Sequence, residues 1–162
     1  VRGYRLLADD MAVVQSFSGK KDSRELALVY PAFPYQKLCR DAAVRRGYAL
    51  EKLLYINEEK DKFLVPWKGD FLTEPEPVQA FFMLGVSEKK KVTLRQIQGL
   101  ACLGLYGENL FLRHLLKQEK YRPDIGQKCL ELAAQVPSFY LERPKEGDST
   151  EEVLEQILNT IK

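Results

Sequence analysis

The sequence has little histidine, tryptophan or cysteine for its length. Its 162 residues include one histidine, one tryptophan and three cysteines. A metal site built on histidine and cysteine is excluded, because no two cysteines have the spacing of a ligand pair. The cysteines are odd in number and lie in apolar sequence, which predicts reduced core thiols in a cytoplasmic protein rather than disulfides. A serine or cysteine nucleophile activated by His114 stays open, although a histidine inside a helical run is more often a packing or surface residue.

A large excess of one charge is also missing. Lysine and arginine total 25 against 23 aspartates and glutamates, a net charge of +2. Non-specific binders of nucleic acid or of membrane surfaces normally carry a large basic excess, so neither partner is expected. No apolar run reaches the ~18 residues that a membrane span needs. The chain is 45% hydrophobic, enough for a buried core, which excludes wholesale disorder.

The length predicts a single domain over residues 1–162. No internal repeat or low-complexity segment divides it. Residues 1–8 already resemble the interior of a fold, whereas natural domains usually begin with a few loosely held polar residues. We therefore expect the domain to be the later part of a longer protein.

Apolar runs separated by turn residues predict strands. These runs cover residues 4–8, 12–17, 25–30, 53–57, 62–66, 78–86 and 138–142. Polar connections at 18–23 and 58–61 predict two hairpins, and Lys89–Lys91 is interpreted as a solvated turn.

Helical patterns cover residues 37–46, 95–105, 109–118 and 124–135, with a final helix after Ser149. Ser149 and Glu152 have the spacing of a capping box at the start of that helix. An apolar stripe follows at helical spacing, formed by Val153, Leu154, Ile157, Leu158 and Ile161. Together the elements predict a mixed α/β domain, with hairpins in a mixed sheet and helices toward the C-terminus.

No phosphate loop of the Walker A type is present. That loop requires G-x-x-x-x-G-K-[ST], because its backbone amides wrap the phosphates and its lysine reaches the terminal one. Gly19-Lys20 comes nearest to the motif. However, Val14 stands where the first glycine is needed and Lys21 where serine or threonine is needed. A hairpin turn is the simpler interpretation.

The strongest chemical signal is the pair Asp9-Asp10, which follows the apolar run 4–8. Carboxylates at the carboxyl end of a buried strand are where α/β folds place contacts to ligands and Mg²⁺. Two adjacent acids can divide the work, one holding the metal and the other accepting a proton from an attacking hydroxyl. The alternative is an ordinary turn, in which aspartate is also common, and spacing does not decide between the two.

Residues 3–10, Gly3-Tyr4-Arg5-Leu6-Leu7-Ala8-Asp9-Asp10, closely resemble the Walker B strand of the HPr serine kinase/phosphorylase family and its smaller relatives. That family has the fold of the phosphoenolpyruvate-carboxykinase-like kinases. Similar spacing continues at residues 31–38, 59–63, 75–84 and 138–141. The resemblance therefore extends through most of the chain.

The resemblance implies an ATP-dependent serine kinase that uses Mg²⁺ and acts on a peptide or protein bearing an acceptor serine. Asp9 and Asp10 would be the catalytic and metal-binding pair, one a general base and the other a metal ligand. Lys37 and Lys62 would contact phosphate or substrate, with ordinary surface lysines as the alternative. Because family members are often multimers, the resemblance also implies a homo-oligomer. We expect the protein to be cytoplasmic.

Two departures from the family pattern shape the functional prediction. The family's phosphate loop precedes the Asp-Asp strand, so the chain would be the C-terminal part of a longer kinase domain. The glycine- and arginine-rich C-terminal segment of the bifunctional HPr enzymes has no counterpart here, which places the chain closer to small peptide-tailoring kinases such as lasso-peptide precursor kinases. The alternative function is a non-catalytic, kinase-like binding or regulatory module without its own ATP site.

Overall fold

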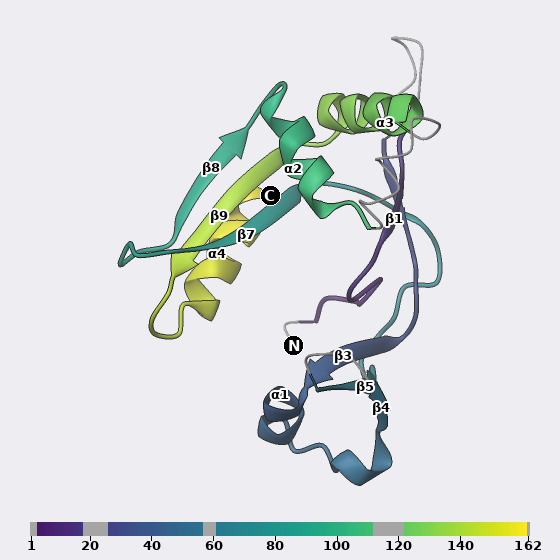
Figure 1. The fold of residues 1–162 in the computed structure, drawn as a ribbon, viewed down its shortest axis with the longest axis vertical. Coiled ribbons are helices and arrows are strands. Elements are labelled where there is room, and N and C mark those ends of the chain that lie inside the picture. The colour runs from purple at the N-terminus through teal and green to yellow at the C-terminus, as the bar shows by residue number, and fades with distance from the viewer. Residues whose placement is uncertain (1–2, 18–25, 57–60, 112–121, 162) are drawn as a thin grey trace. The chain divides into compact units, whose positions relative to one another are not determined.

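The computed structural model describes residues 3–17, 26–56, 61–111 and 122–161 (Figure 1). The chain forms two compact units. Unit 1 comprises Val1–Val14 and Leu28–Glu76, and unit 2 comprises Gln15–Ala27 and Pro77–Lys162. Each unit has a three-stranded sheet of its own.

The sheet of unit 1 is antiparallel, with strand order β3-β5-β4. Its strands are β3 (Tyr35–Cys39), β5 (Lys62–Pro66) and β4 (Leu54–Ile56), and the unit also contains helix α1 (Arg40–Arg45) and the short 3₁₀ helix η1 (Leu50–Lys52). Phe63 and Val65 of β5 are buried, as is Ala43 of α1. The Arg40 guanidinium lies 5.1 Å from the centre of the Phe63 ring. Helix α1 therefore covers the face of the sheet that carries Phe63.

The opposite face of this sheet is partly exposed to solvent. Successive side chains of a strand alternate between faces, so Leu64 points away from the side that carries Phe63. Lys37 and Leu54 are the partners of Leu64 on the two neighbouring strands and share its face. Leu54 is 67% exposed, so this face is in contact with solvent at β4.

Residues 4–8 do not form the buried strand that the apolar run predicts. Tyr4 is 61% exposed, and only Leu6 forms a bridge, with Phe71. Two backbone hydrogen bonds hold that bridge, from Leu6 N–H to the Asp70 carbonyl at 3.0 Å and from Leu72 N–H to the Leu6 carbonyl at 2.8 Å. The segment pairs at one residue because its partner is an irregular connection, so apolar composition alone does not extend it into a strand.

The helix predicted over residues 37–46 begins later, at Arg40. Residues 35–39 instead pair with β5, because tertiary pairing overrides a weak local preference. Gly47, with φ +74°, follows the helix as expected for a glycine at a helix end. The hairpin strands predicted at 53–57 and 62–66 are confirmed as β4 and β5.

A further small sheet has strand order β1-β2-β6. Its strands are β1 (Val13–Gln15), β2 (Leu28–Tyr30) and β6 (Glu76–Pro77). The strands predicted at 12–17 and 25–30 are confirmed as neighbours, although shorter than expected. Their predicted polar connection at 18–23 lies outside the described residues.

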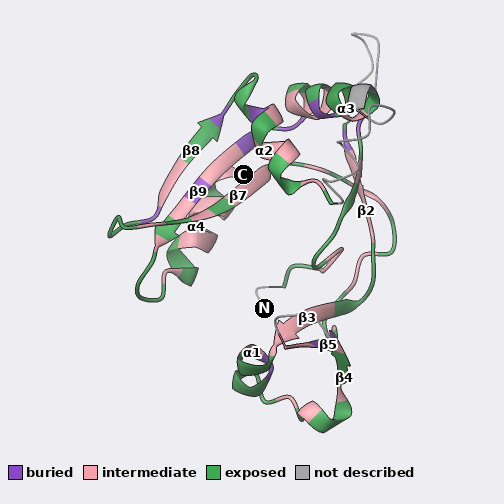
Figure 2. Ribbon diagram, in the orientation of Figure 1, coloured by how far each residue is buried: buried purple, intermediate pink, exposed green. Residues whose placement is uncertain are grey.

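The sheet of unit 2 is mixed, as the sequence predicts. Its strands are β7 (Phe81–Ser87), β8 (Thr93–Ile97) and β9 (Ser138–Pro144), and its helices are α2 (Ala101–Asn109), α3 (Arg122–Gln135) and α4 (Thr150–Thr160). Strand β9 is central, parallel to β7 and antiparallel to β8. Leu141 of this central strand is 1% exposed, and other buried residues of the unit lie on β8, α2 and α3 (Figure 2).

The helical predictions for unit 2 are partly wrong. The helix predicted over 95–105 begins only at Ala101, because residues 93–97 pair with β9 as β8. The prediction over 124–135 is confirmed as α3. Residues 112–118 of the helix predicted over 109–118 lie outside the described residues. Helix α2 ends at Asn109.

The predicted capping box of α4 is also wrong. Ser149 is the N-cap residue but forms no side-chain capping bond. The Asp148 carboxylate instead accepts a hydrogen bond from the Thr150 N–H at 3.0 Å. Glu152 turns to another element, where its carboxylate accepts a hydrogen bond from the Val92 N–H at 3.3 Å. Tertiary contact thus takes the glutamate that a local capping pattern would use.

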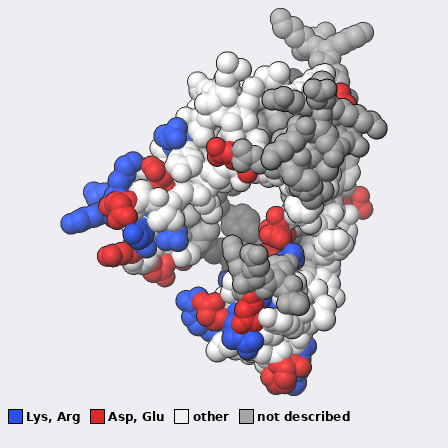
Figure 3. Space-filling model, in the orientation of Figure 1, with Lys and Arg blue, Asp and Glu red and all other residues white. Residues whose placement is uncertain are grey.

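Charges of both signs are mixed on the surface. On the face shown in Figure 3, lysine and arginine side chains lie among aspartates and glutamates rather than in a field of one sign. This agrees with the near balance of the composition. In the part of the chain that the structure describes, no helix has both the length and the apolar character needed to cross a bilayer.

Candidate functional site

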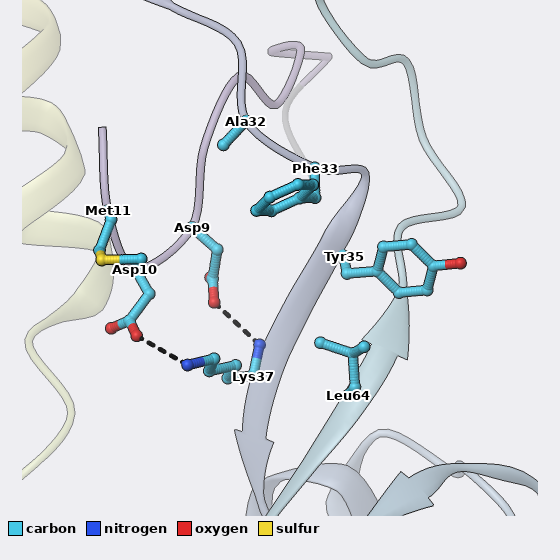
Figure 4. A pocket seen from close by; sticks show the side chains of 8 residues that line it. All are labelled: Asp9, Asp10, Met11, Ala32, Phe33, Tyr35, Lys37 and Leu64. Carbon is cyan, nitrogen blue, oxygen red and sulfur yellow. Dashed lines mark hydrogen bonds and ion pairs between the residues drawn. The ribbon is translucent and has the colours of Figure 1, made fainter. Parts of the chain in front are cut away.

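Unit 1 contains a pocket of about 330 Å³ that brings together residues from separate segments (Figure 4). It is lined by Asp9, Asp10, Met11, Ala32, Phe33, Tyr35, Lys37 and Leu64. The acids come from the segment after residues 4–8, and the aromatic side chains come from the connection into β3 and from β3 itself. The pocket therefore joins a charged edge to an apolar wall.

Backbone contacts on both sides hold the segment that carries the acids. Leu6 is bridged to Phe71, and the Leu7 carbonyl accepts a hydrogen bond from the Ala32 N–H at 2.9 Å. The chain then bends at Asp9 and Asp10. This bend presents both carboxylates to β3, although no regular strand precedes them.

Lys37 contacts both acids through different atoms. Its backbone N–H donates a hydrogen bond to Asp9 Oδ2 at 2.8 Å, and its Nζ donates to Asp10 Oδ2 at 3.2 Å (Figure 4). The side chain of Asp10 is 52% exposed and that of Lys37 is 30% exposed. Three of the four residues predicted to form the site thus lie in one pocket.

The two contacts differ in how firmly they hold an acid. A backbone N–H in a strand has a fixed position, so Asp9 is anchored to β3. Asp10 is paired with the end of a flexible side chain, and ion pairs as exposed as this one are weak because water and salt screen them. Asp10 is therefore held less firmly than Asp9.

The apolar wall consists of unusually exposed side chains. Phe33 is 70% exposed, Met11 is 43% exposed and Tyr35 is 41% exposed. In Figure 4 the Tyr35 hydroxyl points away from both acids. Exposed apolar side chains that gather in one place typically mark a binding surface rather than a solvated one.

The fourth predicted residue, Lys62, does not line the pocket. It lies on β5, opposite Cys39 of β3 and Ile56 of β4. Lys62 lies two positions before Leu64 on the strand. Its side chain therefore shares the face of Leu64, at a distance of about 7 Å from that residue. The structure places Lys62 beside the site rather than in it.

The donor set of the pocket suits Mg²⁺ better than a metal that needs a full protein cage. Among the described residues, no group of three or more histidine, cysteine, aspartate or glutamate side chains is arranged to hold a metal. Mg²⁺ in phosphate chemistry needs only one or two carboxylates, because water and phosphate oxygens complete its octahedron. Asp9 and Asp10 fit this requirement, provided that the Lys37 ammonium leaves Asp10.

Several lining residues were not predicted as site residues. Phe33 stands between Pro31 and Pro34, which end one strand and prevent a helix. An aromatic side chain in such a connection has little secondary structure to pack it, and that signal could have identified it. Leu64 could not have been found this way, because its role depends on its pairing with Lys37 across the sheet.

A second cavity, of about 210 Å³, lies in unit 2 between β7 and α2. It is lined by Phe81, Phe82, Met83, Leu105, Tyr106 and Asn109, a set without a carboxylate or an amine. The Tyr106 and Ser138 hydroxyls are hydrogen-bonded at 2.7 Å, and burial raises the pKa of Tyr106. This cavity therefore lacks the acid–base groups that the pocket of unit 1 provides.

Comparison of the chain with protein-family models, with curated proteins and with solved structures finds no match. Within the described residues, Asp9, Asp10 and Lys37 form the charged cluster that borders a cavity large enough for a ligand.

Proposed function

We propose that the chain is an ATP-dependent serine kinase that acts on a peptide or protein and uses Mg²⁺. The observation that carries the proposal is the meeting of two carboxylates and a lysine at the edge of one pocket in unit 1. The resemblance of residues 3–10 to the acidic strand of HPr-kinase-like enzymes supports the same chemistry. The proposed fold, beyond a mixed α/β chain, is that of the phosphoenolpyruvate-carboxykinase-like kinases.

Asp9 is the proposed general base. A base must be held within hydrogen-bond reach of the hydroxyl that it deprotonates, and the bond from the Lys37 N–H fixes Asp9. The serine O–H proton passes to the Asp9 carboxylate as the serine oxygen forms a bond to the γ-phosphorus of ATP. The bond from that phosphorus to the bridging oxygen breaks, and ADP leaves with the electron pair.

Asp10 and Lys37 are the proposed charge-handling pair. When bound at the acids, Mg²⁺ supplies positive charge that offsets the charge developing on the phosphoryl oxygens. Asp10 is suited to hold it because its present partner is displaceable. The released Lys37 ammonium then contacts a phosphate oxygen, where a charge-assisted hydrogen bond is stronger than its exposed ion pair. Lys62, on the same face, would make a more distant contact.

A peptide-binding module without catalysis is the second candidate. The observation in its favour is that Lys37 already neutralises Asp10 and hydrogen-bonds Asp9, while the rest of the pocket is exposed apolar surface. Such a pocket can hold a peptide without any transfer of phosphate. The two candidates differ in whether Asp9 and Asp10 are needed for chemistry.

A Mg²⁺ titration of phosphoryl transfer separates the proposed roles. The whole chain is assayed with ATP and a degenerate library of serine peptides, as wild type, Asp9→Asn and Asp10→Asn. Asp9→Asn should lower the maximal rate at every Mg²⁺ concentration, and Asp10→Asn should raise the Mg²⁺ concentration needed for half the maximal rate. Asp41→Asn is the matched control, because Asp41 lies on α1 outside the pocket with a side chain that is 71% exposed.

The titration also decides between the candidates. Excess EDTA should abolish the activity of the wild type, and the Asp41→Asn variant should behave as wild type. Rates for Asp9→Asn and Asp10→Asn that match this control would remove the two acids from the chemistry. Binding of the peptides without transfer by the wild type would favour the non-catalytic module.

A further inference from the structure

The sheet face that carries Leu64 extends beyond the pocket of unit 1. Lys37, Leu64 and Leu54 are successive partners across β3, β5 and β4, so their side chains project in one row. Lys37 lies at the acids, Leu64 lines the pocket, and Leu54 is 67% exposed beyond it. The row thus leads from the charged edge of the pocket to an apolar surface.

Charged and apolar side chains both line this pocket. The charged residues are Asp9, whose carboxylate accepts the Lys37 backbone N–H, and Asp10, which pairs with the Lys37 ammonium. Phe33 and Leu64 belong to the apolar lining next to these groups, with Leu64 directly opposite Lys37 on the neighbouring strand (Figure 4). A ligand that fits both parts must present a reactive polar group next to an apolar one.

We infer that the acceptor is a peptide segment in which a large apolar residue adjoins the serine. The apolar side chain packs against Phe33 and Leu64, with the following chain directed toward Leu54, while the serine hydroxyl faces Asp9. This inference rests on the proposed function, because it identifies the substrate class of the same site. Phe33 and Leu64 become specificity residues, a role distinct from that of the acids.

The chemistry of the pocket favours a peptide side chain over the base of a nucleotide. A purine has ring nitrogens and substituents that need hydrogen-bond partners, and the apolar wall contributes none from the side chains of Phe33 and Leu64. Two carboxylates against one ammonium leave a net negative charge, which suits a neutral or cationic chain better than an anionic nucleotide. The volume of about 330 Å³ lies at the small end of ligand sites and suits one large side chain with its adjoining backbone.

The inference is tested with peptides of one sequence that differ beside the serine. The flanking position carries leucine, phenylalanine, alanine, lysine or glutamate, and two quantities are measured with the whole chain. One is kcat/KM for phosphorylation with Mg²⁺ and ATP, and the other is peptide binding by fluorescence anisotropy without ATP. The variants are Phe33→Ala and, as matched control, Phe111→Ala, because Phe111 belongs to unit 2 and is 68% exposed against 70% for Phe33.

The inference expects leucine or phenylalanine beside the serine to raise kcat/KM at least ~10-fold over alanine, the lower end of discrimination by an apolar pocket. Phe33→Ala should remove most of this preference and Phe111→Ala should keep it. Phosphorylation without an apolar preference, or a Phe33→Ala effect on the KM for ATP alone, would overturn the inference and leave the kinase proposal standing. Binding with an apolar preference but no phosphorylation would support the peptide site and overturn the kinase proposal, and neither binding nor phosphorylation would overturn both.

Discussion

At the scale of single residues, Lys37 organises the candidate site in a way that its side chain alone does not explain. Its backbone N–H holds Asp9 and its ammonium pairs with Asp10. A substitution of the side chain should therefore release Asp10 and leave Asp9 anchored. Lys62 offers a comparison, since it lies on the same sheet face outside the pocket.

We predict that Lys37→Met lowers kcat for phosphoryl transfer at least ~10-fold, because it removes one charge-assisted hydrogen bond to phosphate, while Lys62→Met has a much smaller effect. Steady-state kinetics with Mg²⁺, ATP and a serine peptide measure both. Equal losses in the two variants would mean that the pocket as described is not where phosphate binds.

Asp61 provides a second prediction at this scale, which concerns pH. Two hydrogen bonds join it to Arg40, from Nε to Oδ2 at 2.6 Å and from Nη2 to Oδ1 at 3.2 Å. The hydrogen bond from this guanidinium lowers the pKa of Asp61. A carboxyl whose pKa is lower in the folded state stabilises the fold above its unfolded pKa of about 3.9, and that contribution is lost as the pH falls through the folded value.

Asp61→Asn should therefore lower the urea midpoint of unfolding at pH 7 more than at pH 3. Asparagine is the suitable replacement because Asp61 has φ +48°, a conformation that asparagine tolerates better than alanine does. Asp41→Asn, on the exposed side of α1, serves as the control. A difference between wild type and Asp61→Asn that is the same at both pH values would contradict the pair's role.

At the scale of elements, the sequence is most informative where a pattern is decided locally. The hairpin β4–β5, helix α3 and strand β9 follow from runs of apolar residues bounded by polar turns. Residues 37–39 and 95–97 are predicted to be helical from the sequence but belong to β3 and β8, because partners far along the chain pair with them. Residues 4–8 are predicted to form a strand but pair only at Leu6, because an apolar run extends its pairing only beside a regular strand.

The same distinction applies to the candidate site. Asp9 and Asp10 are identified from their residue type and position, Lys37 is implied by the family resemblance, and the structure brings the three together. Leu64 and Leu54 could not be identified, because the row that they form with Lys37 exists only through strand register. The local sequence thus indicates which charged groups the pocket contains. Strand pairing determines which side chains of the sheet lie beside them.

The start of α4 gives a prediction at the element scale. Hydrogen bonding with the Thr150 side chain, and then with its N–H, lowers the pKa of Asp148, whereas the Ser149 side chain forms no capping bond. Asp148→Ala should therefore lower the melting temperature more than Ser149→Ala does at pH 7. Thermal unfolding followed by circular dichroism measures both, and the reverse order would show that the capping box predicted from sequence forms after all.

At the scale of the whole molecule, the candidate site is contained in unit 1, since all eight residues that line the pocket belong to it. The 162 residues contain no Walker A motif to cradle a triphosphate. Two neighbouring carboxylates repel phosphate unless a divalent cation lies between them. Under the proposed function, the pocket would therefore need Mg²⁺ to bring ATP to Asp9 and Asp10.

We accordingly predict weak ATP binding by this chain, detectable only with Mg²⁺. Titration calorimetry with and without Mg²⁺ in excess over ATP measures this affinity. The Asp9→Asn/Asp10→Asn double variant should lose the dependence of ATP binding on Mg²⁺. Tight binding without Mg²⁺ would mean that ATP binds at a site other than the pocket of Asp9 and Asp10.

The main proposal is that Asp9 and Asp10 assist the transfer of phosphate from ATP to serine. Mass spectrometry of serine peptides incubated with the whole chain, Mg²⁺ and ATP tests it most directly. We expect a phosphoserine product whose rate of formation falls at least ~100-fold in the Asp9→Asn/Asp10→Asn double variant, the lower end of what a general base contributes. No phosphoserine from the wild type, or an unchanged rate in the double variant, would contradict it.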